Sequence, residues 1–199
     1  MAAPVVVMVA GPNGAGKSSV APGLVAKALG VVEYVNADVI ARGISGFNED
    51  AAALSAGRIM LARLEELAAA HASFAFETTG ASRSFGSRLA ELKKAGYRFY
   101  LFFVWVRSVD ISVQRVARRV MLGGHNIPEM TIARRYMRGL VNFFDLYRGL
   151  ADEWRFYDNS APGKAILVAD GGCDRRETIH GTETWLTVLH MAQTARSDG

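Results

Sequence analysis

Short, strongly apolar segments alternate with longer amphipathic ones along the chain. The first segment, PVVVMVA at positions 4–10, is β-branched and continuously apolar, which is typical of a strand buried on both faces of a sheet. Further strands are expected at Val32–Val35, Ser73–Phe76, Tyr97–Val106, Arg155–Tyr157 and Ala165–Val168. Helices are expected over Lys17–Leu29, within Asn48–Ala70, over Ser84–Ala95, over Ser108–Leu122, from Pro128 onward and over Glu177–Ala195. Strands that alternate with helices predict an α/β fold in which helices cover both faces of a parallel sheet.

A glycine-rich turn directly follows the first strand. Its sequence GPNGAGKS matches the pattern G-x-x-x-x-G-K-[ST] without deviation, between the buried strand and helix that the pattern requires. The glycines let successive N–H groups curl around phosphate oxygens, and the helix behind adds its positive N-terminal end. Lys17 can reach the β- and γ-phosphates, and the Ser18 hydroxyl can ligate Mg²⁺. We therefore predict an ATP site formed by Gly11, Asn13, Gly14, Ala15, Gly16, Lys17, Ser18 and Ser19.

The loop by itself fits a kinase, a switch GTPase or a motor ATPase. The chain has no N-K-x-D run of the kind that reads guanine, and 199 residues leave little room for motor machinery. A small kinase needs a base near the acceptor hydroxyl, a substrate clamp and cations over the transferred phosphoryl group. The remaining sequence contains candidates for all three parts.

Asp38 is the candidate base. It follows the second expected strand, and the carboxyl ends of parallel strands share one crevice with the phosphate loop. A carboxylate there can accept the proton of an attacking hydroxyl, and Asn36 can orient it. The alternative is that Asp38 is the N-cap of a helix that continues with Val39 and Ile40.

Polar residues also follow the third expected strand. Glu77 emerges into the same crevice, where it can hold Mg²⁺ through water or bind substrate hydroxyls. Thr78 and Thr79 offer hydroxyls, and Arg83 can contact an anionic substrate group. The alternative is an exposed strand-end acid followed by a polar helix start.

Arginines are concentrated in one stretch. Eight of the eighteen arginines lie between Arg107 and Arg148, together with three acidic residues. Two of the expected helices meet at Gly123-Gly124, and each carries arginines on one face: Arg115 and Arg119 on the first, and Arg134 and Arg138, with Arg135 adjacent, on the second. Such a hinged pair suits a lid over transferring phosphates. The alternatives are a solvated helix face and a nucleic-acid-binding surface, and His125 is read as a turn residue.

Composition narrows the class of protein. An apolar fraction of 50% excludes intrinsic disorder, and the single cysteine, Cys173, excludes a disulfide scaffold. The first apolar run spans about nine residues, whereas a membrane-spanning helix needs roughly 20, and it lacks the basic flank of a signal peptide. We expect one cytoplasmic domain over residues 1–199, with the lid at about 107–148 and no membrane partner. The net charge of +4 allows an anionic partner.

Five segments together resemble the zeta-toxin-like P-loop kinases. They are GPNGAGKSS, VNADVIA, FETT, RVARRVMLGGHNIPEMTIARRYMRGL and FYDNS, between Val5 and Ser160. The resemblance implies a three-layer P-loop kinase fold with a mostly parallel five-stranded sheet and a helical lid. It also implies ATP and Mg²⁺ as cofactors, a hydroxyl of a UDP-N-acetyl sugar as acceptor, and a small antitoxin as partner.

The resemblance assigns roles by position. Lys17 and Ser18 correspond to the phosphate and Mg²⁺ ligands, and Asp38 to the catalytic aspartate. Glu77 and Thr79 correspond to the pair that contacts the sugar nucleotide. Arg119, Arg134 and Arg135 fall in the region of the arginine pair over the phosphates. Asn159 ends a strand where adenine is expected.

The resulting hypothesis is an ATP-dependent kinase that phosphorylates a small-molecule hydroxyl. The alternative is a nucleic-acid-linked P-loop protein, either a polynucleotide end-kinase or a nucleotide-dependent binder, that uses the arginine-rich stretch. The aromatic residues of that stretch follow the spacing of a buried helix face, which favours the small-molecule kinase.

Overall fold

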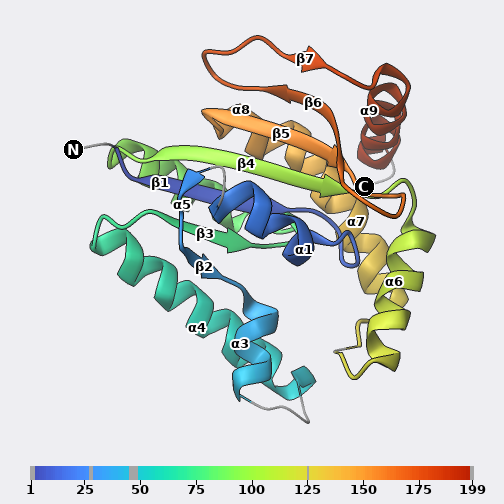
Figure 1. Cartoon of the computed structure of the whole chain (residues 1–199), viewed down its shortest axis with the longest axis horizontal. Coiled ribbons are helices and arrows are strands. Elements are labelled where there is room, and N and C mark those ends of the chain that lie inside the picture. Colours follow the sequence, from blue (N-terminus) through green and yellow to red (C-terminus); the bar gives the residue numbers. More distant parts are fainter. Residues whose placement is uncertain (1–2, 27–28, 45–48, 125, 198–199) are drawn as a thin grey trace.

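A computed structural model describes residues 3–26, 29–44, 49–124 and 126–197. In this part of the chain, seven strands form one sheet in the order β2-β3-β1-β4-β5-β6-β7 (Figure 1). The strands are β1 (Val5–Ala10), β2 (Glu33–Val35), β3 (Phe74–Glu77), β4 (Arg98–Trp105), β5 (Glu153–Asp158), β6 (Ile166–Gly171) and β7 (Thr178–Ile179).

The first five strands are parallel, and the last two extend the sheet in antiparallel fashion. The expectation of a five-stranded sheet is therefore wrong in number, because the described residues form seven strands, although the sheet is mostly parallel as expected. The seven residues between β5 and β6 are too few for a crossover helix, so β6 returns beside β5 as a hairpin.

Helices lie on both faces of the sheet. In Figure 1, α1 crosses in front of the strands and α5 runs behind them. The helices are α1 (Lys17–Ala21), α3 (Ala37–Ile44), α4 (Glu49–Ala69), α5 (Ser84–Lys94), α6 (Val109–Met121), α7 (Glu129–Asn142), α8 (Arg148–Leu150) and α9 (Thr182–Ser197). Two π-helical turns, η1 (Pro22–Ala26) and η2 (Phe143–Tyr147), continue α1 and α7. Among the helices of the described residues, none is long and apolar enough to cross a membrane.

Two expected helices differ from the observed ones. The helix expected over Lys17–Leu29 changes from α to π geometry at Pro22, whose ring removes the N–H that an α-helical bond needs. The helix expected over Glu177–Ala195 is wrong at its start, because Thr178 and Ile179 form β7 and α9 begins at Thr182. A two-residue strand is too short to show the alternation by which a sequence reveals a strand.

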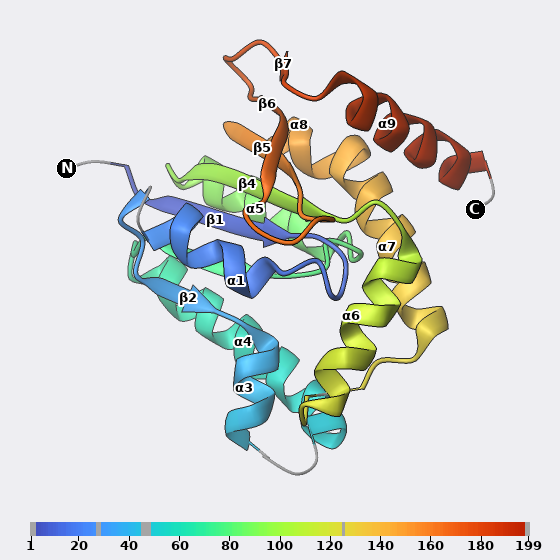
Figure 2. The same cartoon turned by 45° about the vertical axis from the view of Figure 1, so that its right-hand side comes forward.

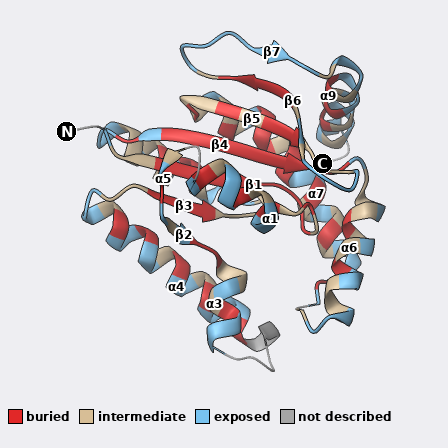
Figure 3. Ribbon diagram, viewed as in Figure 1, coloured by how far each residue is buried: buried red, intermediate tan, exposed pale blue. Residues whose placement is uncertain are grey.

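The sheet interior and one aromatic cluster make up most of the core. β1 and β4 are buried along nearly their whole lengths (Figure 3). Phe143 contacts Trp154, Phe156 and Trp185 edge-on, with ring centroids 5.6, 5.2 and 6.4 Å away. This aromatic cluster ties the end of α7 to β5 and α9, so the arginine-rich helix α7 is anchored at one end in the core.

Candidate functional site

The phosphate loop connects β1, at the centre of the parallel strands, to α1. Gly11, Gly14 and Gly16 have φ angles of +141°, +74° and +82°, a backbone region that L-residues with a side chain rarely adopt. A Cβ atom on Gly11 would lie 1.9 Å from the carbonyl oxygen of Val104. The loop therefore has the tight backbone that the sequence pattern predicted, pressed against β4.

Lys17 is buried inside this loop. Its Nζ donates to the carbonyl oxygens of Gly11 and Pro12, both at 2.9 Å, and lies 3.8 Å from Oε1 of Glu77. Burial lowers the pKa of Lys17, while the nearby carboxylates of Glu77 and Asp38 act in the opposite direction. The ammonium group is thus held across the loop, where a phosphate oxygen can take the place of a carbonyl partner.

Glu77 connects the loop to β2 and β3. Its Oε2 accepts hydrogen bonds from Ser18 Oγ at 2.8 Å, Tyr34 OH at 2.6 Å and Asn36 Nδ2 at 2.9 Å. Ser18, Asn36 and Glu77 were predicted as site residues from the sequence, whereas Tyr34 was not. The available signal was the period of two along a strand, which places Tyr34 and Asn36 on the same side of the chain.

The donor set around Ser18 suits a magnesium ion. Mg²⁺ prefers oxygen ligands and is usually held by one or two protein groups together with phosphates and water. The Ser18 hydroxyl and the Glu77 carboxylate are such oxygens, 2.8 Å apart beside the phosphate loop. The described residues contain no cluster of three or more His, Cys, Asp or Glu that could hold a metal by themselves. A metal here would therefore depend on the nucleotide for further ligands.

Asp38 lies in the first turn of α3, beside the same crevice. Asn36 Oδ1 accepts the backbone N–H of Asp38 at 2.8 Å, so Asn36 is the residue that caps α3. The alternative role of Asp38 as the N-cap is therefore wrong. The Asp38 side chain is half-exposed, and its Oδ2 lies 3.5 Å from Nη1 of Arg119 on α6.

A cavity of about 530 Å³ joins these groups to the arginine-rich helix α7. Among its lining residues are Asn13, Lys17, Asn36, Asp38, Glu77, Thr78, Thr79, Arg134, Arg135 and Arg138. Within the described residues, no carboxylate pairs with Arg134, Arg135 or Arg138. One cavity therefore contains the phosphate-loop lysine, the candidate base, the acid at the end of β3 and three unneutralised guanidinium groups.

The two arginine-rich helices contact each other beyond the loop end of the strands, and α3 faces α6 (Figure 2). Arg115 on α6 donates to the carbonyl oxygen of Ser160 at 2.9 Å and to that of Gly14 at 3.5 Å. Arg115 was named in the sequence only as a member of a helix face, whereas here its guanidinium touches the phosphate loop itself. Its partner Gly14 is 101 positions away, which sequence spacing does not reveal.

Close packing brings α7 against the end of β3. A Cβ atom on Gly139 would lie 2.6 Å from the carbonyl oxygen of Thr79. Asn142 Nδ2 donates to the carbonyl oxygens of Gly80 and Ala81 at 2.9 and 3.0 Å. Neither residue was predicted from the sequence, where the glycine inside a helical segment was the one signal available.

Some predicted site residues have other surroundings. Arg83 donates to Asn142 Oδ1 at 3.4 Å and is not among the described residues that line the cavity. Asn159 Nδ2 donates to the carbonyl oxygen of Ala15 at 2.8 Å, so the side chain of Asn159 contacts the backbone of the phosphate loop. Ser19 is exposed on α1. His125 lies outside the described residues.

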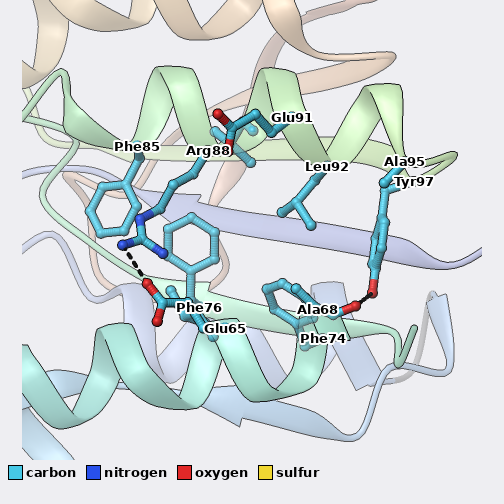
Figure 4. A pocket seen from close by; sticks show the side chains of 12 residues that line it. Glu65, Ala68, Phe74, Phe76, Phe85, Arg88, Glu91, Leu92, Ala95 and Tyr97 are labelled. Carbon is cyan, nitrogen blue, oxygen red and sulfur yellow. Dashed lines mark hydrogen bonds and ion pairs between the residues drawn. The ribbon is translucent and has the colours of Figure 1, made fainter. Parts of the chain in front are cut away.

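A second cavity, of about 270 Å³, lies between α4 and α5 and is mostly apolar (Figure 4). Phe74, Phe76 and Tyr97 line it, and an ion pair of 2.7 Å between Arg88 and Glu65 crosses it. It contains none of the groups predicted to act on phosphate, and it shares only Phe85 with the cavity at the phosphate loop. The chemistry-bearing residues therefore belong to the larger cavity.

The parallel sheet, the phosphate loop and the arginine-lined cavity are those of a P-loop kinase. A family model described as Zeta toxin matches residues 1–161, and the chain belongs to this family, as the resemblance in the sequence predicted. A protein of Haemophilus influenzae described as an uncharacterized protein is 30% identical over 126 residues, which are 63% of this chain and 88% of that protein.

Solved structures share the fold at low sequence identity. A chain of the AvrRxo1-ORF1:AvrRxo1-ORF2 complex with sulphate ions has a TM-score of 0.73 at 14% identity, covering 94% of this chain and 63% of that one, so this chain spans less than two thirds of its length. A chain of the PezAT toxin-antitoxin system of Streptococcus pneumoniae has a TM-score of 0.64 at 12% identity and covers 100% and 88%. A gluconokinase of Sinorhizobium meliloti has a TM-score of 0.50 at 19% identity and covers 99% and 97%.

Proposed function

We propose that the protein transfers the γ-phosphoryl group of ATP to a hydroxyl of a small molecule. The observation that carries this proposal is the cavity that holds Lys17, Asp38 and Glu77 together with three arginines that pair with no carboxylate of the described residues. A related chain, that of the AvrRxo1-ORF1:-ORF2 complex, has been solved with ATP, which supports ATP as the donor.

The roles follow from where each group lies. The loop N–H groups and Lys17 bind the phosphates of the nucleotide. Asp38 accepts the proton of the acceptor hydroxyl, and Glu77 and Thr79 bind and orient the acceptor from the end of β3. Arg119, Arg134 and Arg135 bind the phosphoryl oxygens as charge spreads over them, because planar guanidinium groups match such oxygens.

Magnesium completes this arrangement. When bound through Ser18 and Glu77, Mg²⁺ would neutralise charge on the β- and γ-phosphates. The ion pair between Asp38 and Arg119 bridges α3 and the lid. A nucleotide that attracts Arg119 to its phosphates leaves the Asp38 carboxylate available as the base.

The acceptor class is proposed more narrowly as a sugar nucleotide. Arg134, Arg135 and Arg138 supply more positive charge than one transferred phosphoryl group needs, which supports an acceptor with an anionic group of its own. The nucleic-acid alternative loses support because Tyr136, Phe143 and Tyr147 are buried and cannot stack on bases. PezAT is a toxin-antitoxin system, which supports a small antitoxin as a further partner.

The test is transfer of labelled phosphate from ATP to a panel of hydroxyl acceptors that includes UDP-N-acetyl sugars, the free sugars and oligonucleotides. Replacing Asp38 by Asn removes the proton acceptor while it keeps the side-chain shape. We expect Asp38→Asn to lose roughly 10²–10⁴ of the transfer rate while ATP binding survives.

The matched control is Asp110→Asn, an exposed aspartate at the start of α6 outside this cavity, which should keep the wild-type rate. Equal rates for Asp38→Asn and wild type would remove Asp38 as the base. Transfer to oligonucleotides alone would replace the proposal by the end-kinase alternative.

A further inference from the structure

Tyr34 is the member of the Glu77 cluster that the proposed reaction leaves without a role. It lies in β2, one strand away from Glu77, and the register pairs Tyr34 with Ala75 of β3. Its hydroxyl donates to Glu77 Oε2 at 2.6 Å, the shortest of the three hydrogen bonds on that oxygen. A charge-assisted hydrogen bond of this length from O–H to a carboxylate is among the stronger ones in proteins.

The hydroxyl of Tyr34 is a permanent donor. A phenolic hydroxyl keeps its proton at neutral pH, so Tyr34 donates this hydrogen bond and the carboxylate of Glu77 accepts it. The side chain is nevertheless 36% exposed, which shows that core packing alone does not account for a tyrosine here. Phenylalanine would fill the same space without the hydrogen bond.

The hydrogen bonds around Glu77 form a network that connects Tyr34 to Ser18, the residue that follows Lys17 of the phosphate loop. Ser18 donates its hydroxyl hydrogen to the same Oε2 atom that Tyr34 and Asn36 fix. Because the hydrogen of Ser18 is committed to Glu77, the lone pairs of Ser18 Oγ are left for a metal ion. Partners that orient metal ligands in this way typically change metal affinity or activity by about 10–100-fold when they are removed.

We propose that Tyr34 is a positioning residue that holds Glu77 and, through it, Ser18 in the arrangement that accepts Mg²⁺ with the nucleotide. The inference deepens the proposed function and rests on it, since it assigns the metal to Ser18 and Glu77. It predicts that loss of the Tyr34 hydroxyl weakens binding of the magnesium complex of the nucleotide and leaves binding of the metal-free nucleotide unchanged.

The experiment is calorimetric titration of a non-hydrolysable ATP analogue with and without Mg²⁺, which measures binding without turnover. For wild type we expect tighter binding with Mg²⁺. For Tyr34→Phe we expect roughly 10-fold weaker binding with Mg²⁺ and unchanged binding without it. Tyr100→Phe is the control, because Tyr100 is a buried tyrosine of β4 whose hydroxyl bonds no other described residue, and it should match wild type in both titrations.

A double-mutant cycle separates positioning from general loosening of the fold. If Tyr34 acts through Glu77, Tyr34→Phe has no further effect on the magnesium-dependent binding of a Glu77→Gln variant. Equal added losses in both backgrounds, or a Tyr34→Phe protein that matches wild type, would overturn the role of Tyr34 and leave the proposed function standing. A wild type that binds the analogue equally with and without Mg²⁺ would overturn the magnesium site at Ser18 and Glu77 and the role of Tyr34 with it, whereas only the transfer assay can overturn the proposed function.

Discussion

Gly11 determines how close the phosphate loop can lie to β4. Its φ of +141° disfavours any residue with a side chain. A Cβ atom at this position would also lie 1.9 Å from a carbonyl oxygen of β4, which is a steric clash. Strained backbone of this kind costs roughly 1–3 kcal/mol for a residue with a side chain. The overlap adds to this cost, because the neighbour is backbone and cannot rotate away.

Gly11→Ala is expected to lower the free energy of unfolding by at least about 2 kcal/mol and to abolish ATP binding. Thermal and urea unfolding measure the first effect, and calorimetry the second. Gly23→Ala is the matched control, because Gly23 has an ordinary φ and nothing within 4 Å of its added Cβ. A Gly11→Ala protein as stable as Gly23→Ala would contradict the packing described here.

Tyr34 and Arg115 show why some site residues escape prediction from sequence. The loop glycines, Lys17 and Ser18 act through neighbours in the chain, so spacing is enough to find them. Tyr34 donates to a carboxylate 43 positions away, and Arg115 to a carbonyl oxygen 101 positions away. Such partners become visible only when the register of the strands and the packing of α6 are known.

At the scale of elements, α6 and α7 both contain arginines, but these arginines lie in different surroundings. Arg134 of α7 lines the cavity at the phosphate loop, whereas Arg118 of α6 is exposed and outside it. Net charge and helix propensity change equally when either arginine is replaced by alanine. The pair therefore separates an effect of position from an effect of charge.

Arg134→Ala is expected to reduce the rate of phosphoryl transfer by about 10³-fold, as loss of an arginine that stabilises the transferring phosphoryl group does. Arg118→Ala is expected to stay near wild type. Single-turnover rates at saturating ATP provide the measurement. Equal losses in both variants would show that the lid acts through its summed charge.

The elements themselves were predictable where they are long. β1, β3, β4, α5 and α6 lie within about two residues of their expected bounds, because β-branched runs, caps and glycines mark them. β7 was missed because two residues show no period, and the change from α1 to the π-helical η1 was missed because proline alters the hydrogen bonds of a helix without ending its apolar pattern.

At the scale of the whole molecule, the proposed nucleotide site lies at the end of the central strand β1, which pairs with both β3 and β4. A ligand bound there is coupled to the stability of the entire sheet, since unfolding destroys the site. The effect on stability depends on ligand concentration relative to the dissociation constant.

At 100 times its dissociation constant, ATP with Mg²⁺ is expected to stabilise the protein by about 2.7 kcal/mol, which raises the melting temperature by roughly 5–11 °C for a chain of this size. Calorimetric melting with and without nucleotide tests this. Lys17→Ala should lose the shift, while Lys164→Ala, an exposed lysine in the turn before β6, should keep it. A full shift in Lys17→Ala would place the nucleotide elsewhere.

The central position of β1 also has a consequence for the order of events during synthesis. Val6 pairs with Phe74 and Val5 with Arg98, so β1 leaves the ribosome well before the strands that pair with it on either side. At roughly 5–20 residues per second, this apolar strand spends several seconds without its neighbours. The growing chain therefore carries an apolar strand without its partners for this time, and the proposed nucleotide site is completed only after β3 and β4 have been made.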